Sequence, residues 1–423
     1  MTEMLTLAIP WMGLIIISLA AVQVGILVYS SIDKRIRERQ YHRLAQAEWV
    51  EQTEKAAAGR QQDEGKTAWN GTRKFQVADK VDEGGSITSF YLEPHDRQPL
   101  PSFRPGQYLT FKLRIPGQEK TTIRCYSLSD SPRSNRYRVS IKRVGPPRDK
   151  PEAPPGLSSN FFHDTVVSGD ILDVNAPSGH FSLDTESERP VVLIGGGVGL
   201  TPVLSMLNSI AETGAKRETH FFYGVRNGQE HIMRDHLNEL RQRGPNIHVH
   251  VVYSSPDDDN QAGRDYDHTG HIGVDLFKEV LPSNNYEFYI CGPPPMMQAV
   301  TQQLADWGVP EQDIHFEAFG PATVKKTQKP ETHTGEPKQE FTVRFRKAGK
   351  EATWTEDKGS LLDLAEACGI TIESGCRAGN CGTCATALRA GRIRYLSEPG
   401  AEEETGSCFT CVAVPTEAVE LDA

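Results

Sequence analysis

The sequence predicts a multidomain protein: an N-terminal transmembrane helix, an antiparallel β-barrel, an α/β domain with a parallel sheet and a small C-terminal α+β domain. Three observations support this fold class. Residues 5–29 contain no charged side chain, and residues 74–143 hold segments that alternate apolar and polar side chains, as antiparallel strands do. Residues 189–202 run from an apolar strand through a glycine turn into a helix, the start of a parallel α/β unit.

The 423 residues are enough for about two to four domains. The charged residues 33–71 predict a helical stalk and linker, and the Pro-, Lys- and Thr-rich composition after residue 322 predicts a second linker. The predicted parts are the anchor (1–32), the stalk and linker (33–71), the barrel (72–184), the α/β domain (185–322), the second linker (323–339) and the C-terminal domain (340–423).

The overall charge and the cysteine content exclude two classes of protein. With 46 basic and 56 acidic residues the net charge is −10, which argues against a nucleic-acid partner because phosphates would not be neutralised. The eight cysteines do not form a disulfide framework if four of them bind metal, so we expect a reducing compartment.

The apolar N-terminal segment predicts a single-pass membrane anchor. At about 1.5 Å per residue, residues 5–29 extend roughly 37 Å, enough to cross a hydrocarbon core of ~30 Å. A cleavable signal peptide is the alternative, but the acidic Glu3 and the length of the apolar segment argue against it. Lys and Arg side chains are frequent in the segment 34–43 that follows. We therefore expect the helix to insert in the inner (plasma) membrane with the downstream domains on the cytoplasmic side.

A cysteine motif near the C-terminus predicts an iron–sulfur cluster. A Cys-x4-Cys-x2-Cys sequence with one distant fourth cysteine is the plant-type [2Fe–2S] spacing, and Ala378, Gly379 and Gly382 let the loop wrap the cluster closely. A structural zinc site is the alternative, although it would favour paired Cys-x2-Cys motifs. The predicted ligands are Cys376, Cys381, Cys384 and Cys411.

The choice of the fourth ligand, and the fold around it, come from a resemblance. The sequence Phe-Thr-Cys-Val-Ala-Val-Pro at 409–415 resembles the end of [2Fe–2S] ferredoxin domains, which implies that Cys411 is the ligand and that Cys408 is an ordinary thiol. Strands at 341–346 and 351–354 and a helix at 361–368 precede the cysteines. This order resembles the β-grasp ferredoxin.

The strands of the predicted barrel carry a flavin motif. Arg124-Cys-Tyr126-Ser127 and the helix start Gly156-Leu-Ser-Ser159-Asn resemble the ferredoxin–NADP reductase superfamily, although an isolated Arg-x-Tyr-Ser can also be a surface strand. The resemblance implies that Arg124 pairs with a flavin phosphate, that Tyr126 packs on the flavin and that Ser127 lies near N5. It also implies that the helix start at Gly156 and Ser159 binds phosphate through its exposed N–H groups.

The glycine turn of the α/β domain predicts a dinucleotide site. The glycines let a pyrophosphate approach the backbone at a helix N-terminus, and Thr201 can cap that helix with Pro202 in its first turn. The turn departs from Gly-x-Gly-x-x-Gly but matches the Gly-Gly-x-Gly-x-Thr-Pro version of the same superfamily. Further strands are expected at 219–225, 248–253 and 286–290. The glycines of this turn are Gly195, Gly196, Gly197 and Gly199.

Two later segments complete the predicted active site. The loop Cys291-Gly292-Pro293 follows a strand and could be a simple turn, but the superfamily resemblance implies that it places the Cys291 thiol beside the nicotinamide. The resemblance also makes Glu317 a proton-relay or positioning group and Phe319 the aromatic that covers the flavin. Phenylalanine here is similar to the reductase half of flavohaemoglobins and to oxygenase reductases, which implies FAD, with FMN as the alternative used by some phthalate-type reductases.

The nucleotide preference depends on the end of the strand at 219–225. Arg226 could bind a 2′-phosphate or stack on adenine. Because a serine–arginine cluster typical of NADPH-dependent relatives is missing from this segment, we predict NADH, with NADPH as the alternative.

These motifs predict an electron-transfer enzyme. NADH gives up two electrons as hydride and a [2Fe–2S] cluster accepts one at a time, so the flavin lies between them, with Ser127, Cys291 and Glu317 as the catalytic residues. The domain order resembles phthalate-dioxygenase-type reductases and the reductase of the hybrid-cluster protein, which implies a membrane-anchored reductase for an oxygenase, hydroxylase or desaturase. A respiratory module that reduces quinone and a non-catalytic redox sensor are the alternatives.

Overall fold

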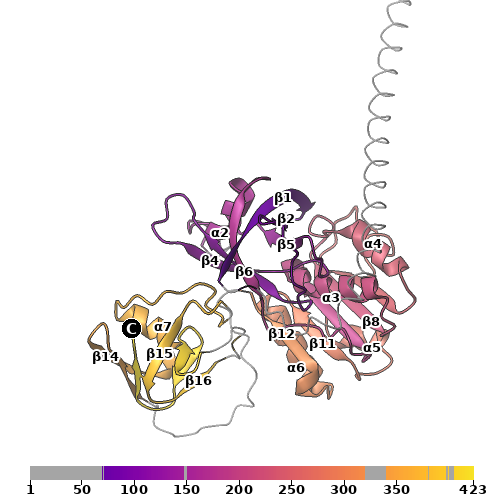
Figure 1. The fold of residues 1–423 in the computed structure, drawn as a ribbon. Helices are drawn as coiled ribbons and strands as arrows, with labels where there is room; N and C mark the ends of the chain where they lie inside the picture. The colour runs from indigo at the N-terminus through magenta and orange to yellow at the C-terminus, as the bar shows by residue number, and fades with distance from the viewer. Residues whose placement is uncertain are drawn as a thin grey trace, which may run out of the picture. The chain divides into compact units, whose positions relative to one another are not determined.

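The computed structural model describes residues 69–319 and 340–423, apart from residues 70, 147–149, 380, 397, 398 and 400–403 (Figure 1). The predicted anchor (1–32), the predicted stalk up to residue 68 and the predicted linker (323–339) lie outside these residues. Within the described part of the chain, no helix combines the length and the apolar character needed to cross a membrane.

The first described domain is a closed antiparallel barrel, as the alternating pattern predicted. Its elements are β1 (Thr72–Gly84), β2 (Ile87–Pro94), β3 (Tyr108–Leu113), β4 (Thr122–Ser127), β5 (Tyr137–Lys142), α2 (Leu157–Asp164) and β6 (Ile171–Ser178). The strand order is β4-β3-β6-β1-β2-β5, and neighbouring strands are antiparallel. A bridge between Leu128 and Val139 joins the two edges and closes the sheet. Phe75, Phe90 and Phe111 are completely buried inside it.

The second domain contains a parallel sheet covered by helices on both faces. Its elements are β7 (Val191–Gly196), η2 (Gly197–Gly199), α3 (Leu200–Thr213), β8 (Thr219–Val225), α4 (Arg234–Gln242), β9 (Ile247–Tyr253), β10 (His268–Thr269), α5 (Val274–Val280), β11 (Glu287–Cys291), α6 (Pro294–Asp306), η3 (Glu311–Asp313) and β12 (Ile314–Glu317). The strand order is β10-β9-β8-β7-β11-β12, with parallel neighbours. The order reverses at β7, so the carboxyl end of β7 is where an open α/β sheet binds its ligand.

Apolar side chains on both faces hold this sheet between its helices. Leu204 and Leu207 of α3 and Leu237 of α4 pack on one face, whereas Phe277 of α5 and Val300 of α6 pack on the other. Burying one such side chain stabilises the fold by about 1.5–3 kcal/mol. The two helical layers therefore hold the strand ends of the site in fixed register.

The C-terminal domain is a small mixed sheet packed on one helix, in agreement with the predicted α+β class. Its elements are β13 (Phe341–Phe345), β14 (Lys350–Trp354), η4 (Glu356–Lys358), α7 (Leu361–Ala367), β15 (Ala385–Ala390), β16 (Ile393–Tyr395), β17 (Ser407–Phe409), β18 (Ala413–Pro415) and β19 (Val419–Leu421). The main sheet has the order β14-β13-β19-β15-β17, with β13 parallel to β19, and β16 pairs separately with β18. Ser360 begins α7 with a capping box formed with Asp363.

Candidate active site

The predicted flavin motif forms the last part of β4. Tyr126 packs edge-on against Phe111 and Phe162, with ring centroids 5.7 and 5.2 Å apart, and burial raises its pKa. Ser127, the last residue of the strand, is buried. Arg124 Nη1 donates to the carbonyl of Ile123 at 2.6 Å. The motif thus presents one arginine, one aromatic ring and one hydroxyl along a single barrel strand.

The predicted phosphate-binding helix start is present at α2. Gly156 is the N-cap residue, and Ser159 Oγ donates to its carbonyl at 3.1 Å while accepting from the Val144 N–H at 3.2 Å. A Cβ at position 156 would lie 2.8 Å from both Ser159 Oγ and Val144 Cβ, so glycine is needed for this close approach. Ser159 therefore ties the helix start to the segment after β5.

Lys80 stabilises the other end of α2. Its Nζ donates to the carbonyls of Phe162, His163 and Val166 at 3.2, 2.7 and 2.8 Å. A cation at a helix C-terminus satisfies carbonyls that lack an intrahelical partner and interacts favourably with the helix dipole. The sequence did not indicate this role, since Lys80 lies in a strand 77 or more residues before the helix.

The glycine turn joins β7 to α3 at the carboxyl edge of the parallel sheet. Gly197 has φ +53° and open space at its Cβ position, whereas Gly195 and Gly196 would contact α3 and the β11–α6 loop if they had side chains. A Cβ at Gly199 would lie 2.4 Å from the Cys291 carbonyl oxygen. The turn thus leaves space beside Gly197 and fixes the start of α3 against Cys291.

The predicted cap of α3 was wrong. Gly199 is the N-cap residue, and Thr201 lies inside the first turn, where its Oγ1 donates to the Val198 carbonyl at 3.1 Å. The reason is that η2 brings the chain into helical geometry earlier than the Thr-Pro pair suggests. Pro202 lies in the first turn as predicted.

Cys291 and Glu317, which we predicted to lie beside the nicotinamide, are register partners in β11 and β12. Cys291 is completely buried, and burial raises the pKa of its thiol well above the usual value. Burial also raises the pKa of Glu317 to about 8, and its Oε2 has no hydrogen-bond partner among the described residues. Glu317 is therefore a carboxylic acid that retains its proton at neutral pH.

Three further predicted residues lie at the ends of these strands. Gly292 packs closely on Gly196, and Pro293 is the N-cap of α6. Phe319 follows β12 and is 41% exposed, so its ring is available to cover a bound group.

Arg226 follows β8 and has an exposed side chain. Its carbonyl accepts from the Ser255 N–H at 2.8 Å, which joins the loops after β8 and β9. Next to it, Asn227 Oδ1 is buried without a hydrogen-bond partner in the described part of the chain. The sequence argument missed Asn227; a polar residue directly after a parallel strand at the ligand-binding edge was the available signal.

The four predicted cluster cysteines come together as two pairs. Cys376 and Cys381 each receive the other's backbone N–H on sulfur, at 3.2 and 3.3 Å, and the sulfurs of Cys384 and Cys411 lie 3.1 Å apart. Among the described residues, no three His, Cys, Asp or Glu side chains surround a single point suited to one metal ion. Two thiolate pairs are the donor set in which each iron of a two-iron cluster takes two cysteines.

The backbone around these cysteines also suits a cluster. The N–H of Ala378 points at Cys376 Sγ at 3.4 Å, and that of Gly379 points at Cys411 Sγ at 3.3 Å. Gly379 and Gly382 have φ near +75° and +71°, which is the left-handed region that glycine tolerates best. Cys408, in contrast, is completely buried in the apolar cluster that contains α7.

The barrel strand with the flavin motif contacts the cysteine loop. Arg124 Nη1 donates to the Gly375 carbonyl at 3.3 Å, and Gly375 directly precedes Cys376. A Cβ at Gly375 would lie 2.9 Å from Ile123, the residue before Arg124. The two predicted redox centres thus lie on adjoining backbone segments.

Comparisons with protein families agree with this division of the chain. Residues 74–183 match the oxidoreductase FAD-binding domain, residues 193–302 the oxidoreductase NAD-binding domain, and residues 345–416 the 2Fe-2S iron-sulfur cluster binding domain.

Comparisons with individual proteins found relatives of two kinds. A flavohemoprotein of Halalkalibacterium halodurans is 43% identical over 254 residues, which are 60% of this chain and 61% of that protein. The FAD/NAD-binding domain of the Vibrio cholerae nitric oxide dioxygenase is 34% identical with a TM-score of 0.53, over 60% of this chain and all of that one. Phthalate dioxygenase reductase is 26% identical with a TM-score of 0.52, over 84% of this chain and 98% of that one. The chain thus spans about 61% of the length of such flavohemoproteins.

Proposed function

Because this chain belongs to the FAD- and NAD-binding oxidoreductases and carries a [2Fe–2S] domain, we propose that it passes electrons from NADH through FAD and the cluster to a partner oxygenase, hydroxylase or desaturase. The observation that carries the proposal is the contact of Arg124 with Gly375, which brings the flavin strand to the loop of Cys376. The likeness to phthalate dioxygenase reductase, a modular structure for electron transfer from pyridine nucleotides to [2Fe–2S], covers 84% of this chain and supports the proposal.

The residues of the barrel would hold the FAD. The N-terminus of α2 at Gly156 and Ser159, together with Arg124, would bind its phosphates, because free N–H groups and a guanidinium favour an anion. Tyr126 and Phe319 would flank the ring, and Ser127 would lie near the reacting nitrogen. When bound, the flavin accepts electrons in pairs and releases them singly, which is the conversion that the cluster requires.

The residues of the parallel sheet would hold NADH and keep the carboxyl group beside its nicotinamide uncharged. The glycine turn at the start of α3, with Thr201 and Pro202 behind it, would bind the pyrophosphate, and Arg226 would meet the adenosine. The loop of Cys291, Gly292 and Pro293 would receive the nicotinamide. Glu317 would keep its proton on a buried carboxyl oxygen up to about pH 8, so no negative charge opposes transfer of hydride.

The cluster ligands would be the two cysteine pairs. Backbone N–H groups that point at the sulfurs stabilise the thiolate charge, which favours the reduced cluster. Cys376, Cys381, Cys384 and Cys411 are the proposed ligands.

We further propose that residues 1–32 anchor the protein in the inner membrane, with residues 72–423 on the cytoplasmic side. The uncharged segment 5–29 and the basic residues that follow it support this location. Fractionation of cells that express the full chain or a chain beginning at residue 72 tests it. We expect the full chain in the membrane fraction and the shorter one in the supernatant. If high salt released the full chain from the membrane, the proposal of a transmembrane anchor would be wrong.

The electron path is tested by adding NADH anaerobically to the purified full chain and following the visible spectrum. We expect loss of the flavin absorbance first and then reduction of the cluster, with NADPH reacting more slowly. If only the flavin were reduced, the cluster would not receive electrons from it and this part of the proposed path would be wrong. If properly folded protein contained no flavin, the proposal would be wrong.

A further inference from the structure

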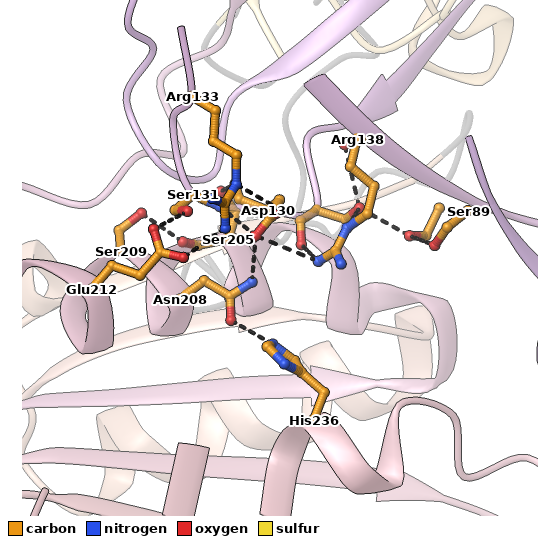
Figure 2. Close-up of polar contacts among 12 residues, drawn as sticks. Ser89, Asp130, Ser131, Arg133, Arg138, Ser205, Asn208, Ser209, Glu212 and His236 are labelled. Carbon is orange, nitrogen blue, oxygen red and sulfur yellow. Dashed lines mark hydrogen bonds and ion pairs between the residues drawn. The ribbon is translucent and has the colours of Figure 1, made fainter. Parts of the chain in front are cut away.

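A carboxylate just beyond the flavin motif joins the barrel to helix α3. Asp130 lies three residues after Ser127, and its side chain is 13% exposed. Asn208 Nδ2 donates to Asp130 Oδ1 at 2.9 Å, and Ser205 Oγ donates to the Asp130 carbonyl at 2.7 Å (Figure 2). Asn208 and Ser205 are both buried on α3. The flavin strand and the helix of the nucleotide turn are therefore linked directly.

Balanced charges stabilise this link. Although burial alone would raise the pKa of Asp130, Arg138 and Arg133 hold it well below its usual range. Arg133 also pairs with Glu212 of α3 at 2.7 Å, and Ser131 Oγ donates to the same carboxylate. Figure 2 shows these side chains converging between the barrel loop and α3. Two guanidinium groups thus face two carboxylates, so the charges of these four side chains balance.

The orientation of the Asn208 amide is set from the other side. His236 of α4 lies with Nε2 2.8 Å from Asn208 Oδ1. Burial lowers the pKa of His236 to about 4, so the ring is neutral at physiological pH and donates from Nε2. With its oxygen occupied, Asn208 presents its NH₂ group to Asp130. The amide therefore has one orientation rather than two.

The two linked elements adjoin the residues predicted to lie beside the flavin and the nicotinamide. The Asp130 loop continues β4, whose last residue is Ser127, and α3 begins at the turn where Gly199 packs on the Cys291 carbonyl. A shift of α3 relative to β4 would therefore change the separation of the predicted flavin and nicotinamide sites. Hydride transfer depends steeply on that separation.

We propose that the Asp130–Asn208 contact is a positioning device for hydride transfer. It sets the distance between the flavin strand and the nicotinamide loop and touches neither cofactor. The proposal concerns reduction of the flavin by NADH and is independent of the protein that accepts the electrons.

The test compares Asn208→Ala with the matched control Asn246→Ala. Asn246 Nδ2 donates to the carbonyls of Ala215 and Arg217 at 2.9 Å, so the control also loses partly buried amide hydrogen bonds, but only within the parallel-sheet domain. In anaerobic stopped-flow experiments at saturating NADH, we expect Asn208→Ala to lower the limiting rate of flavin reduction about 10- to 100-fold. FAD content and the dissociation constant of NADH should change little, and the isotope effect on turnover with C4-deuterated NADH should increase.

The control separates positioning from general loss of stability. Asn246→Ala should keep the limiting rate within about twofold, even though its melting temperature falls. If both variants slowed reduction equally, or if Asn208→Ala melted earlier but reduced flavin at the normal rate, the contact would be structural only. Should Asn208→Ala fail to fold, Asn208→Leu provides the same test, since it keeps a side chain of similar size and removes the amide that donates to Asp130; an unchanged rate there would overturn the proposal.

Discussion

Cys291 and Glu317 occupy the same register position in the neighbouring parallel strands β11 and β12. The thiol is completely buried, and the carboxyl oxygen Oε2 is shielded from solvent without a hydrogen-bond partner in the described residues. A low-polarity environment favours the uncharged form of both acids. The thiol of Cys291 and the carboxyl group of Glu317 are therefore both uncharged and protonated at the position proposed for the nicotinamide.

Replacement of Glu317 should change how stability depends on pH. Its pKa is about 8 in the folded protein, above the ordinary value of 4.5, so the folded state binds the proton more tightly than the unfolded state. Stability from this group is fully present below about pH 4.5 and is lost as pH rises through 8. At about 1.4 kcal/mol per tenfold change in proton affinity, the loss is roughly 5 kcal/mol.

Denaturant titrations of the wild type and of Glu317→Gln between pH 5 and 9 measure this effect. We expect the free energy of unfolding of the wild type to fall relative to that of the variant as pH increases. Parallel curves would show that Glu317 is already ionised at pH 5.

Gly199→Ala should weaken binding of NADH. The new Cβ would lie 2.4 Å from the Cys291 carbonyl and 2.6 Å from the Gly292 nitrogen, so the start of α3 must move away from the nicotinamide loop. Overpacking of this kind costs about 1–3 kcal/mol, which corresponds to an increase of about 5- to 150-fold in the dissociation constant of NADH. Gly145→Ala is the control, because its Cβ position has no atom within 4 Å. Equal binding by both variants would contradict the expected clash.

Cys411→Ser should lose the cluster, whereas Cys408→Ser should retain it. Cys411 lies with its sulfur 3.1 Å from that of Cys384, whereas Cys408 is buried in the apolar cluster with α7. We expect Cys411→Ser to lose most of the iron and the visible absorbance of the cluster. Cys408→Ser should retain both and lose about 1 kcal/mol of stability, because a hydroxyl replaces a buried thiol. Iron and sulfide analysis of the purified variants checks both expectations.

Lys80→Met should loosen the flavin site from a distance. It leaves three carbonyls at the end of α2 without their donor, which we expect to cost about 1–3 kcal/mol and to lower FAD occupancy. Lys74→Met is the matched control, since the Lys74 side chain is 63% exposed and forms an ion pair with Asp173 at the surface of the barrel. Its stability should stay within about 0.5 kcal/mol. Thermal melting and bound-flavin absorbance measure both.

Much of the fold could be predicted because the local patterns were strong. The alternating segments at β1, β2, β3 and β5 and the strand–turn–helix at β7 are where the sequence placed them. Strand β6 was not predicted: Ile171 is 40% exposed and Pro177 lies near its end, so its alternation becomes clear only beside β1 and β3. The short strands β15–β19 likewise depend on pairing within the ferredoxin sheet.

The sequence predicted the parts of the site that are made by one continuous motif. It did not predict the contacts between residues that are far apart in the sequence. The cysteines and the glycine turn are contiguous in sequence, so their spacing carries the information. Asp130 and Asn208 are 78 positions apart, and nothing in either local sequence indicates the other. The N-cap of α3 was misassigned for a local reason, because η2 begins the helical geometry before Thr201.

The position of β19 determines when the iron–sulfur domain can be completed during synthesis. Strand β19 lies between β13 and β15, and Leu421 is completely buried. The sheet therefore lacks its central strand until residues 419–421 have been translated. The barrel and the parallel sheet contain no strand from this region and can fold while it is still being translated. All four cysteines leave the ribosome before β19. The sheet that supports the cysteine loop is therefore completed only after β19 has been translated.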